Sequence, residues 1–234
     1  MSHKTKESDG QGEKRMKKAV VVYGGWLGHT PKESVETFVP LLRAAGFEAN
    51  VTDTLDAYLD TAAMAAADLI VQCWTMGRIT KEQWQGLSAA VFEGTGFAGW
   101  HGGIVDSFRE NTDYQWMTGG QWVAHPGNCI PSHEVRVVDR DHEITRRLGD
   151  FSLPNTEQYY LHIDPGVHVL CETVFTGEHE PKGCYRAGTA MPYAWTREWG
   201  RGHVFVAGWG HTYKDFDVPE AREIVRRGLL WAAR

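Results

Sequence analysis

The sequence predicts an α/β fold in which a mainly parallel sheet carries helices on both faces. Short apolar runs alternate with amphipathic segments through the first half of the chain. Several of the amphipathic segments begin at helix-capping signals and end at glycine, while the apolar runs have the length of buried strands. This alternation indicates right-handed crossovers between parallel strands, with helices packed on the two faces of one sheet.

Four strands and three helices are expected in the first half of the chain. Thr30-Pro31-Lys32-Glu33 combines a capping box with proline at the first helical position, and Gly46 supplies the stop of that helix. Thr80-Lys81-Glu82-Gln83 is a second capping box, which predicts a helix to about residue 93. The strands are expected at residues 19–23, 48–52 and 69–74 and in the run that ends at His101, with a short alanine-rich helix at 59–67.

The second half of the chain is expected to hold a long loop, further strands and a final helix. Residues 111–128 lack periodicity, which in a compact domain is typical of a functional or mobile loop. Gly200-Arg201-Gly202 between two apolar runs predicts a β-hairpin. Strands are expected at 133–138, from 156, at 167–174, 192–197 and 203–207, and helices are expected to start near 104, 141 and 219.

Length and composition indicate one domain. The chain has 234 residues, of which 42% are hydrophobic and 23% charged, and no internal repeat or linker interrupts it. This composition is ordinary for a globular protein, and the length suits one large α/β domain. Residues 18–234 are therefore expected to form a single domain, and the polar residues 1–17 a disordered tail or an expression remnant.

Charge and cysteine content exclude several classes of function. A net charge of −6 and a pI near 6.0 leave no basic footprint for nucleic acid or an anionic membrane. Residues 1–18 lack the apolar core of a signal peptide, and no apolar run reaches membrane-spanning length. The four cysteines form no CxxC pair, which favours the reducing cytoplasm. A homodimer is the default expectation for such a domain.

The run Gly99-Trp100-His101-Gly102-Gly103 is the most informative stretch. An apolar strand stops there at a histidine enclosed by glycines, which allow a tight turn with positive φ that lifts one side chain from the sheet edge. Hydrolases carry Ser or Cys at such an elbow. Imidazole shuttles protons or binds metals but does not form a durable acyl-enzyme, so this elbow argues against ordinary acyl transfer.

Histidines beside turns predict a site at the carboxyl edge of the sheet. His29 and His101 follow strand ends, as does Asp53, and parallel sheets bind ligands beyond those ends. His125 and His211 also lie next to glycine or proline turns. Neutral imidazoles bind Zn²⁺ and similar metals, so His29, His101 and His125 are candidate metal ligands. The alternative is that each histidine is a hydrogen-bonded anchor of its loop.

Glu157 and Tyr159 complete a candidate catalytic set with His101. Glu157 has the chemistry of a general base or a further metal ligand. Tyr159 has that of a hydrogen-bond donor to an oxyanion or enediolate, with core packing as the alternative. The residues expected to contact a substrate are Trp26 and Trp100, as flat platforms, with Gly102, Arg197 and His211.

Four stretches of the chain form a recognisable set. They are Gly24-Gly25 with His29, the elbow at 99–103, Gly119-Gly120 with His125-Pro126, and 192–195 leading through Gly200-Arg201-Gly202 to Gly210-His211. In this order they resemble the trehalose-utilisation ThuA family. The resemblance covers about residue 18 to the C-terminus and implies a flavodoxin-like, doubly wound fold similar to the class I glutamine amidotransferases. Where the family usually has an acidic pair before tyrosine, Thr156-Glu157-Gln158-Tyr159 supplies one carboxylate.

Glutaminase activity is excluded because His101 occupies the position of the amidotransferase cysteine and no Cys-His-Glu set surrounds it. The resemblance implies instead a role in the catabolism of trehalose and related disaccharides through 3-keto sugars. One hypothesis is a lyase or hydrolase that acts on a keto-disaccharide in a His-rich pocket, with a divalent transition metal such as Zn²⁺. The other is a non-catalytic carbohydrate-binding or assembly subunit.

Overall fold

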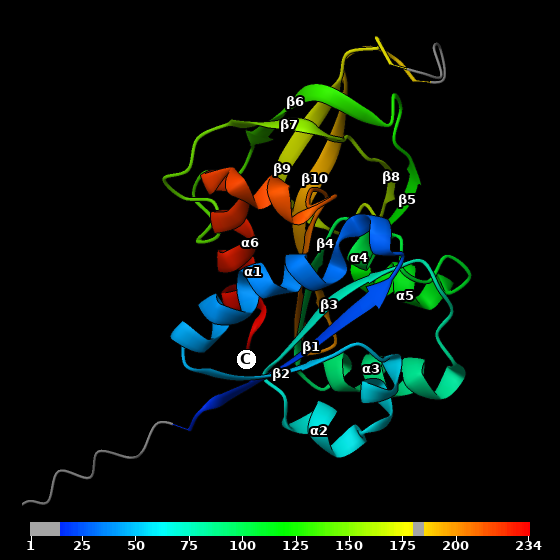
Figure 1. Ribbon diagram of the computed structural model, residues 1–234, viewed down its shortest axis with the longest axis vertical. Coiled ribbons are helices and arrows are strands. Elements are labelled where there is room, and N and C mark those ends of the chain that lie inside the picture. Colours follow the sequence, from blue (N-terminus) through cyan, green and yellow to red (C-terminus); the bar gives the residue numbers. More distant parts are fainter. Residues whose placement is uncertain (1–14, 180–184) are drawn as a thin grey trace, which may run out of the picture.

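A mixed nine-stranded sheet runs through the molecule. The computed structural model describes residues 15–179 and 185–234, and the strand order is β2-β1-β3-β4-β11-β10-β9-β6-β7 (Figure 1). The crossovers between the parallel strands account for the predicted alternation of strand and helix. The parallel half contains β2 (Phe47–Thr52), β1 (Lys17–Gly25), β3 (Leu69–Thr75), β4 (Gly96–Trp100) and β11 (Gly202–Ala207).

The other half of the sheet is antiparallel, beginning with the hairpin at Gly200 that the sequence predicts. The α/β class is confirmed, but parallel pairing is confined to the half of the sheet that runs from β2 to β11. The other strands pair antiparallel, because β6 connects to β7, and β10 to β11, without an intervening helix. The strands of this half are β10 (Thr189–Trp199), β9 (His168–Phe175), β6 (Cys129–Val137) and β7 (Phe151–Glu157), and β5 (Gly120–Ala124) pairs with β8 (Tyr160–Ile163) in a separate small sheet.

The helices cover both faces of the parallel half. α1 (Pro31–Ala44) connects β1 to β2, whereas α3 (Lys81–Phe92) connects β3 to β4 in the other direction along the sheet, so right-handed crossovers put them on opposite faces. α6 (Pro219–Ala232) packs beside α1 (Figure 1). The remaining elements are α2 (Thr61–Ala66) and α5 (Thr112–Thr118) against α3, α4 (Gly102–Val105) against α5, and the 3₁₀ turns η1 (Leu27–His29), η2 (Leu55–Leu59) and η3 (Tyr213–Asp217).

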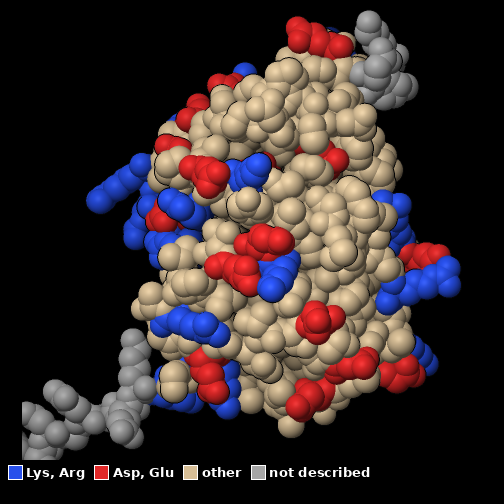
Figure 2. Space-filling view, viewed as in Figure 1, with Lys and Arg blue, Asp and Glu red and all other residues tan. Residues whose placement is uncertain are grey.

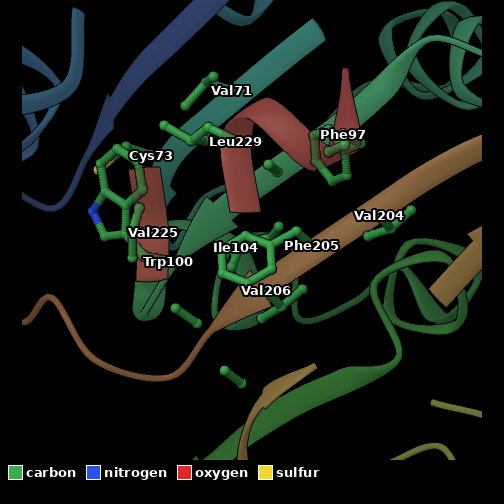
Figure 3. Packing of buried hydrophobic residues seen from close by; sticks show 14 of the residues in the cluster. Val71, Cys73, Phe97, Trp100, Ile104, Val204, Phe205, Val206, Val225 and Leu229 are labelled. Atoms are coloured by element: carbon green, nitrogen blue, oxygen red, sulfur yellow. The ribbon is translucent and has the colours of Figure 1, made fainter. Parts of the chain in front are cut away.

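The core lies between the centre of the sheet and α6. β4 and β11 contribute Phe97 and Phe205, both wholly buried, and Figure 3 shows Val225 and Leu229 of α6 in the same cluster. Gly228 lets the helix approach closely, because a Cβ at this position would lie 2.3 Å from Cδ1 of Phe205. Burying each such apolar side chain stabilises the fold by about 2 kcal/mol.

Only one of the two predicted capping boxes forms. Gln83 N–H donates to Thr80 Oγ1 (3.2 Å), and Thr80 N–H donates to Gln83 Oε1 (2.9 Å). Thr30 instead has a left-handed φ of 44°, and its hydroxyl accepts a hydrogen bond from Tyr213 N–H (3.0 Å). The prediction at Thr30 is wrong because this residue closes the turn at His29 and ties it to the segment after β11.

The predicted loop at 111–128 contains regular structure. It holds α5 and β5, and Asn111 Oδ1 caps α5 by accepting from Tyr114 N–H (2.9 Å). At 141–145, by contrast, a short helix is expected and the structure has bends and turns. In both places the segments are too short for hydrophobic periodicity to identify them.

The N-terminal boundary of the fold precedes the expected one. β1 begins at Lys17, and before it the guanidinium of Arg15 forms an ion pair with Asp68. The predicted tail of residues 1–17 therefore overlaps the start of the sheet, while residues 1–14 lie outside the described part of the chain.

The surface carries both signs of charge. Lysine and arginine are interspersed with aspartate and glutamate on the face seen in Figure 2. The net charge of −6 is thus not gathered into one acidic patch there. Within residues 15–179 and 185–234, no helix combines the length and the apolar character that crossing a membrane requires.

Candidate functional site

His101 occupies a strained turn between β4 and α4. Its φ of 49° and ψ of −144° lie outside the regions that non-glycine residues ordinarily adopt. Its backbone N–H donates to the carbonyl oxygen of Ala207 on β11 (2.7 Å). Gly102 makes room for the turn, since a Cβ there would lie 2.6 Å from Cε1 of His29. The elbow predicted from the sequence is present, and it holds the His101 ring at the sheet edge.

Four histidines surround the carboxylate of Glu157. His101 Nε2 lies 3.1 Å and His211 Nδ1 3.2 Å from Oε2, and His29 Nε2 lies 3.8 Å from the same oxygen. His125 faces the other oxygen, with its Nε2 3.7 Å from Oε1. The cluster therefore brings together one carboxylate and the four histidines that the sequence places beside turns.

Both halves of the large sheet supply this cluster, and His125 follows β5 of the small sheet. His29, His101 and His211 follow β1, β4 and β11, whose carboxyl ends meet at one edge of the parallel half. Glu157 ends β7 in the antiparallel half, where the hydroxyl of Tyr193 donates to its carbonyl oxygen (3.1 Å). Neither half alone holds the complete set.

Burial separates the inner members of the cluster from the outer ones. His101 is 1% exposed, His29 5% and Glu157 6%. The side chains of His125 and His211 are 29% and 14% exposed. The cluster therefore opens to solvent on the side of His125 and His211.

The surroundings favour a neutral His101 and an ionised Glu157. Burial lowers the pKa of the His101 imidazole from 6.5 to about 3, although the contact with Glu157 opposes this shift. Burial alone would raise the pKa of the Glu157 carboxyl, but the contacts from His101, His211 and His29 outweigh it and hold that pKa well below its usual range. A buried negative charge thus stands among imidazole rings.

Hydrogen bonds on their far sides orient two of the inner histidines. His101 Nδ1 lies 2.9 Å from the carbonyl oxygen of Gly208, and His29 Nδ1 lies 2.8 Å from the hydroxyl of Thr75 at the end of β3. Because a carbonyl oxygen only accepts, the hydrogen of a neutral His101 belongs on Nδ1. The lone pair on Nε2 then faces Glu157.

Asp215 joins two of the segments that carry the cluster. Its Oδ2 accepts hydrogen bonds from the Thr156 hydroxyl (2.9 Å) and from the backbone N–H groups of Gly210 and His211 (3.0 Å each). Burial raises the pKa of this carboxyl, against the opposing effect of the three donors. Since Thr156 precedes Glu157 on β7, one buried carboxyl fixes both the strand of Glu157 and the turn of His211.

Two of the predicted substrate contacts are not placed to meet a ligand. Trp100 is 1% exposed and packs against Phe38 and Phe216, with ring centroids 4.9 and 5.7 Å apart, so its ring belongs to the core. Arg197 lies on β10 and donates to Asp164 Oδ2 (3.1 Å), an ion pair that accounts for its charge. The predicted substrate contacts of Trp100 and Arg197 are therefore replaced by structural roles.

The other predicted residues lie at the cluster. The Trp26 ring stands edge-on to His29 with centroids 4.7 Å apart and is 47% exposed, so it borders the opening. Gly102 lies beneath the His29 ring. Tyr159 is buried and stacks on His101 (3.8 Å between centroids, 22° between planes), and burial raises the pKa of its hydroxyl.

An aromatic and cationic wall lies near His125. The Trp122 ring lies 5.6 Å from that of His125, and the guanidinium of Arg109 lies 4.6 Å above the Trp122 ring. Two hydrogen bonds from Arg109 to Asp106 (2.5 and 2.9 Å) fix this guanidinium. Asp53, which the sequence places beside another strand end, is not among the contacts of the cluster.

The chain is similar to one sequence family and to several solved structures. The profile of the ThuA family, described as trehalose utilisation, matches residues 18–232. A ThuA-like protein from Bacteroides uniformis is 17% identical, with a TM-score of 0.76 over 99% of this chain and 95% of that one. A ThuA-like protein from Parabacteroides merdae is 14% identical, with a TM-score of 0.75 over 93% of this chain and 90% of that one.

A solved structure with a different description is also similar in fold. A GMP synthase subunit from Thermoplasma acidophilum is 13% identical, with a TM-score of 0.54 over 93% of this chain and 94% of that one. At such identities the likeness extends to the fold alone. No curated protein matches the chain.

Proposed function

The chain belongs to the ThuA (trehalose utilisation) family, and from this premise we propose that it is a lyase or hydrolase acting on a keto-disaccharide. The observation that carries the proposal is the buried carboxylate of Glu157, ringed by four histidines at the ligand-binding edge of the sheet. A carboxylate that served the fold alone would need neither four imidazoles nor the strained backbone of His101.

The proposed reaction begins with removal of a proton. A ketone acidifies the C–H bond on the adjacent carbon, so a base that takes this proton leaves an enolate, and the glycosidic C–O bond one carbon further then breaks. The departing sugar oxygen takes up a proton and leaves an enone. A lyase stops at this product, whereas addition of water to the enone completes a hydrolysis.

The exposed imidazole of His125 suits these proton transfers better than Glu157 or His101 does. A group whose pKa lies well below its usual range is a weak base, and this holds for both Glu157 and His101. His125 has the most exposed ring of the four, which supports contact with the substrate proton. His101 and Glu157 remain the centre of the proposed catalytic set, and Tyr159 supports His101 by stacking.

Turnover of a 3-keto-disaccharide tests the proposal. We expect the wild type to release the departing sugar, and His101→Ala and Glu157→Gln to lower kcat/KM by at least about 100-fold while circular dichroism shows a retained fold. His168→Ala is the matched control, because this exposed histidine pairs with Asp139 (2.7 Å) outside the cluster. Full turnover by His101→Ala would contradict the catalytic role.

The alternative is a carbohydrate-binding subunit, which the exposed Trp26 ring at the opening supports. It predicts sugar affinity that falls in Trp26→Ala and no turnover under any metal condition. The cytoplasmic location and the homodimer expected from the sequence stay predictions. Fractionation of cells tests the location, and sedimentation analysis tests the oligomeric state.

A further inference from the structure

We propose that His29, His101, His211 and Glu157 bind one divalent transition-metal ion of the Zn²⁺ type. The inference deepens the proposed function, on which it rests for the role of the ion, although metal binding is measured without turnover. It differs from the ligand set expected from the sequence, because His211 takes the place of His125, while Glu157 is the further ligand that the sequence allows.

The separations between donor atoms suit a shared ion. The donor atoms of the four residues all lie within 4.8 Å of one another, and three of the separations, those from Glu157 Oε2, are 3.1, 3.2 and 3.8 Å. Zn²⁺ binds imidazole nitrogen and carboxylate oxygen at about 2.0–2.2 Å, so ligand atoms around one ion lie roughly 3–4 Å apart. Small side-chain adjustments therefore bring the cluster to ligand spacing.

His101 faces a hydrogen-bond acceptor with each ring nitrogen. Nδ1 lies 2.9 Å from the Gly208 carbonyl oxygen, and Nε2 lies 3.1 Å from Glu157 Oε2. A neutral imidazole carries a hydrogen on only one ring nitrogen, so the lone pair of the other nitrogen is aimed at an acceptor. A cation between Nε2 and Oε2 removes this repulsion, and the two candidates are a second proton and a metal ion.

His211 favours the metal ion over the proton. Its Nδ1 lies 3.2 Å from Glu157 Oε2 without the geometry of a hydrogen bond, and within the described residues this buried nitrogen has no other partner. Glu157 Oε2 has two lone-pair sites, so it cannot accept a hydrogen bond from each of the three imidazoles that converge on it. A metal ion accepts a lone pair from each of them and from the carboxylate as well.

The donor types select the class of metal. Three imidazole nitrogens and one carboxylate oxygen suit Zn²⁺ and its transition-metal neighbours, whereas Mg²⁺ and Ca²⁺ prefer oxygen ligands throughout. His125 lies outside this set and towards solvent, with its Nε2 3.7 Å from Glu157 Oε1. A substrate oxygen that approached the ion from this side would meet His125 first.

The ligands already have the outer partners that metal sites require. The Gly208 carbonyl oxygen orients His101, the Thr75 hydroxyl orients His29, and Asp215 holds the turn of His211. Such partners fix the orientation of the ligands, and their loss typically lowers metal affinity by about 10–100-fold. Asp215 is thus a positioning residue of the site.

Metal titration of the full chain, prepared without a histidine tag and stripped with chelator, tests the proposal. We expect one equivalent of Zn²⁺ in competition with a chromophoric chelator, a Co²⁺ absorption spectrum typical of imidazole ligands, and no competition by Mg²⁺. His211→Ala and Glu157→Gln should weaken Zn²⁺ binding by more than about 100-fold, and Asp215→Asn by about 10–100-fold. His125→Ala and His168→Ala should each retain one tightly bound equivalent.

The outcomes separate this inference from the proposed function. Absence of bound Zn²⁺ in the wild type, or unchanged affinity in His211→Ala, which alters a partly exposed residue, overturns the metal site. Turnover that survives complete chelation overturns the role of the ion in the reaction and leaves the proposed function standing. One bound equivalent without turnover of a keto-disaccharide upholds the metal site and overturns the proposed function.

Discussion

The space beneath the His29 ring holds glycine at residue 102 and no larger residue. A Cβ at residue 102 would lie 2.6 Å from His29 Cε1 and 3.0 Å from Cγ2 of Thr75, whose hydroxyl holds that ring. Only glycine leaves His29 in the place where its Nε2 faces Glu157. The absence of a side chain at this position is therefore part of the site.

We expect Gly102→Ala to displace His29 and to weaken Zn²⁺ binding by at least about 10-fold. Overpacking should lower the free energy of unfolding by about 1–3 kcal/mol. Chelator competition and urea unfolding measure the two effects. Gly149→Ala is the control, since a Cβ there meets no atom within 4 Å. Wild-type Zn²⁺ affinity in Gly102→Ala would show that the ring has room to move.

Sequence patterns predict residues of the site when topology brings their positions together. The histidines of the cluster could be predicted because three of them follow strands whose carboxyl ends share one edge. Trp100 could not be assigned correctly, because a tryptophan beside glycine has the same pattern whether it faces the core or solvent. Asp215 could not be identified from the sequence. Two of its partners are backbone N–H groups, which leave no residue pattern, and the third is a hydroxyl that lies far away in the sequence.

At the scale of elements, two ion pairs between successive turns stabilise α6. Glu223 accepts from Arg226 (2.7 Å) and Arg227 (2.6 Å). The hydrogen bond from Arg226, with a further contribution from Arg227 and against the effect of burial, lowers the pKa of Glu223 from 4.5 to about 2. The folded state thus binds fewer protons than the unfolded state between these pH values, so the stabilisation is present above pH 4.5 and is lost towards pH 2.

We expect Glu223→Gln to lower the free energy of unfolding by about 1 kcal/mol at pH 7, because the two ion pairs are partly exposed. This difference from the wild type should shrink as the pH falls from 4.5 to about 2, because the wild-type carboxyl takes up its proton over this range. Urea unfolding over a pH series measures it. Glu198→Gln, an exposed position on β10, is the control. A difference that stayed constant down to pH 2 would rule out this linkage.

Elements could be predicted from the sequence where the signal is local. The capping box at Thr80 and the hairpin at Gly200 each lie within a few residues, and both form. The helix within 111–128 has only seven residues, too few for a hydrophobic stripe, and its caps at Asn111 and Gly119 are the local signs of it. Thr30 shows the opposite error, because a contact with Tyr213 replaces the local cap.

At the scale of the whole molecule, the pairing of β10 with β11 joins the two halves of the sheet. Val206 lies opposite Trp195 in this antiparallel ladder, while β11 pairs in parallel with β4 on its other side. The sequence predicts the hairpin but not that its second strand continues a parallel sheet, because hairpin signals identify neighbours in the chain and not partners in the sheet. Glu157 reaches the histidines only because both halves belong to one sheet.

Because the ladder is continuous, we expect the two halves to unfold in one cooperative transition. In native-state hydrogen exchange, the amides of β3 and β9 should share one free energy of opening, that of global unfolding. Val135→Ala removes wholly buried methyl groups from β6 in the antiparallel half and should lower both values equally, by about 2 kcal/mol. A decrease confined to β9 would mean that the antiparallel half opens by itself, and Glu157 would then leave the histidines without global unfolding.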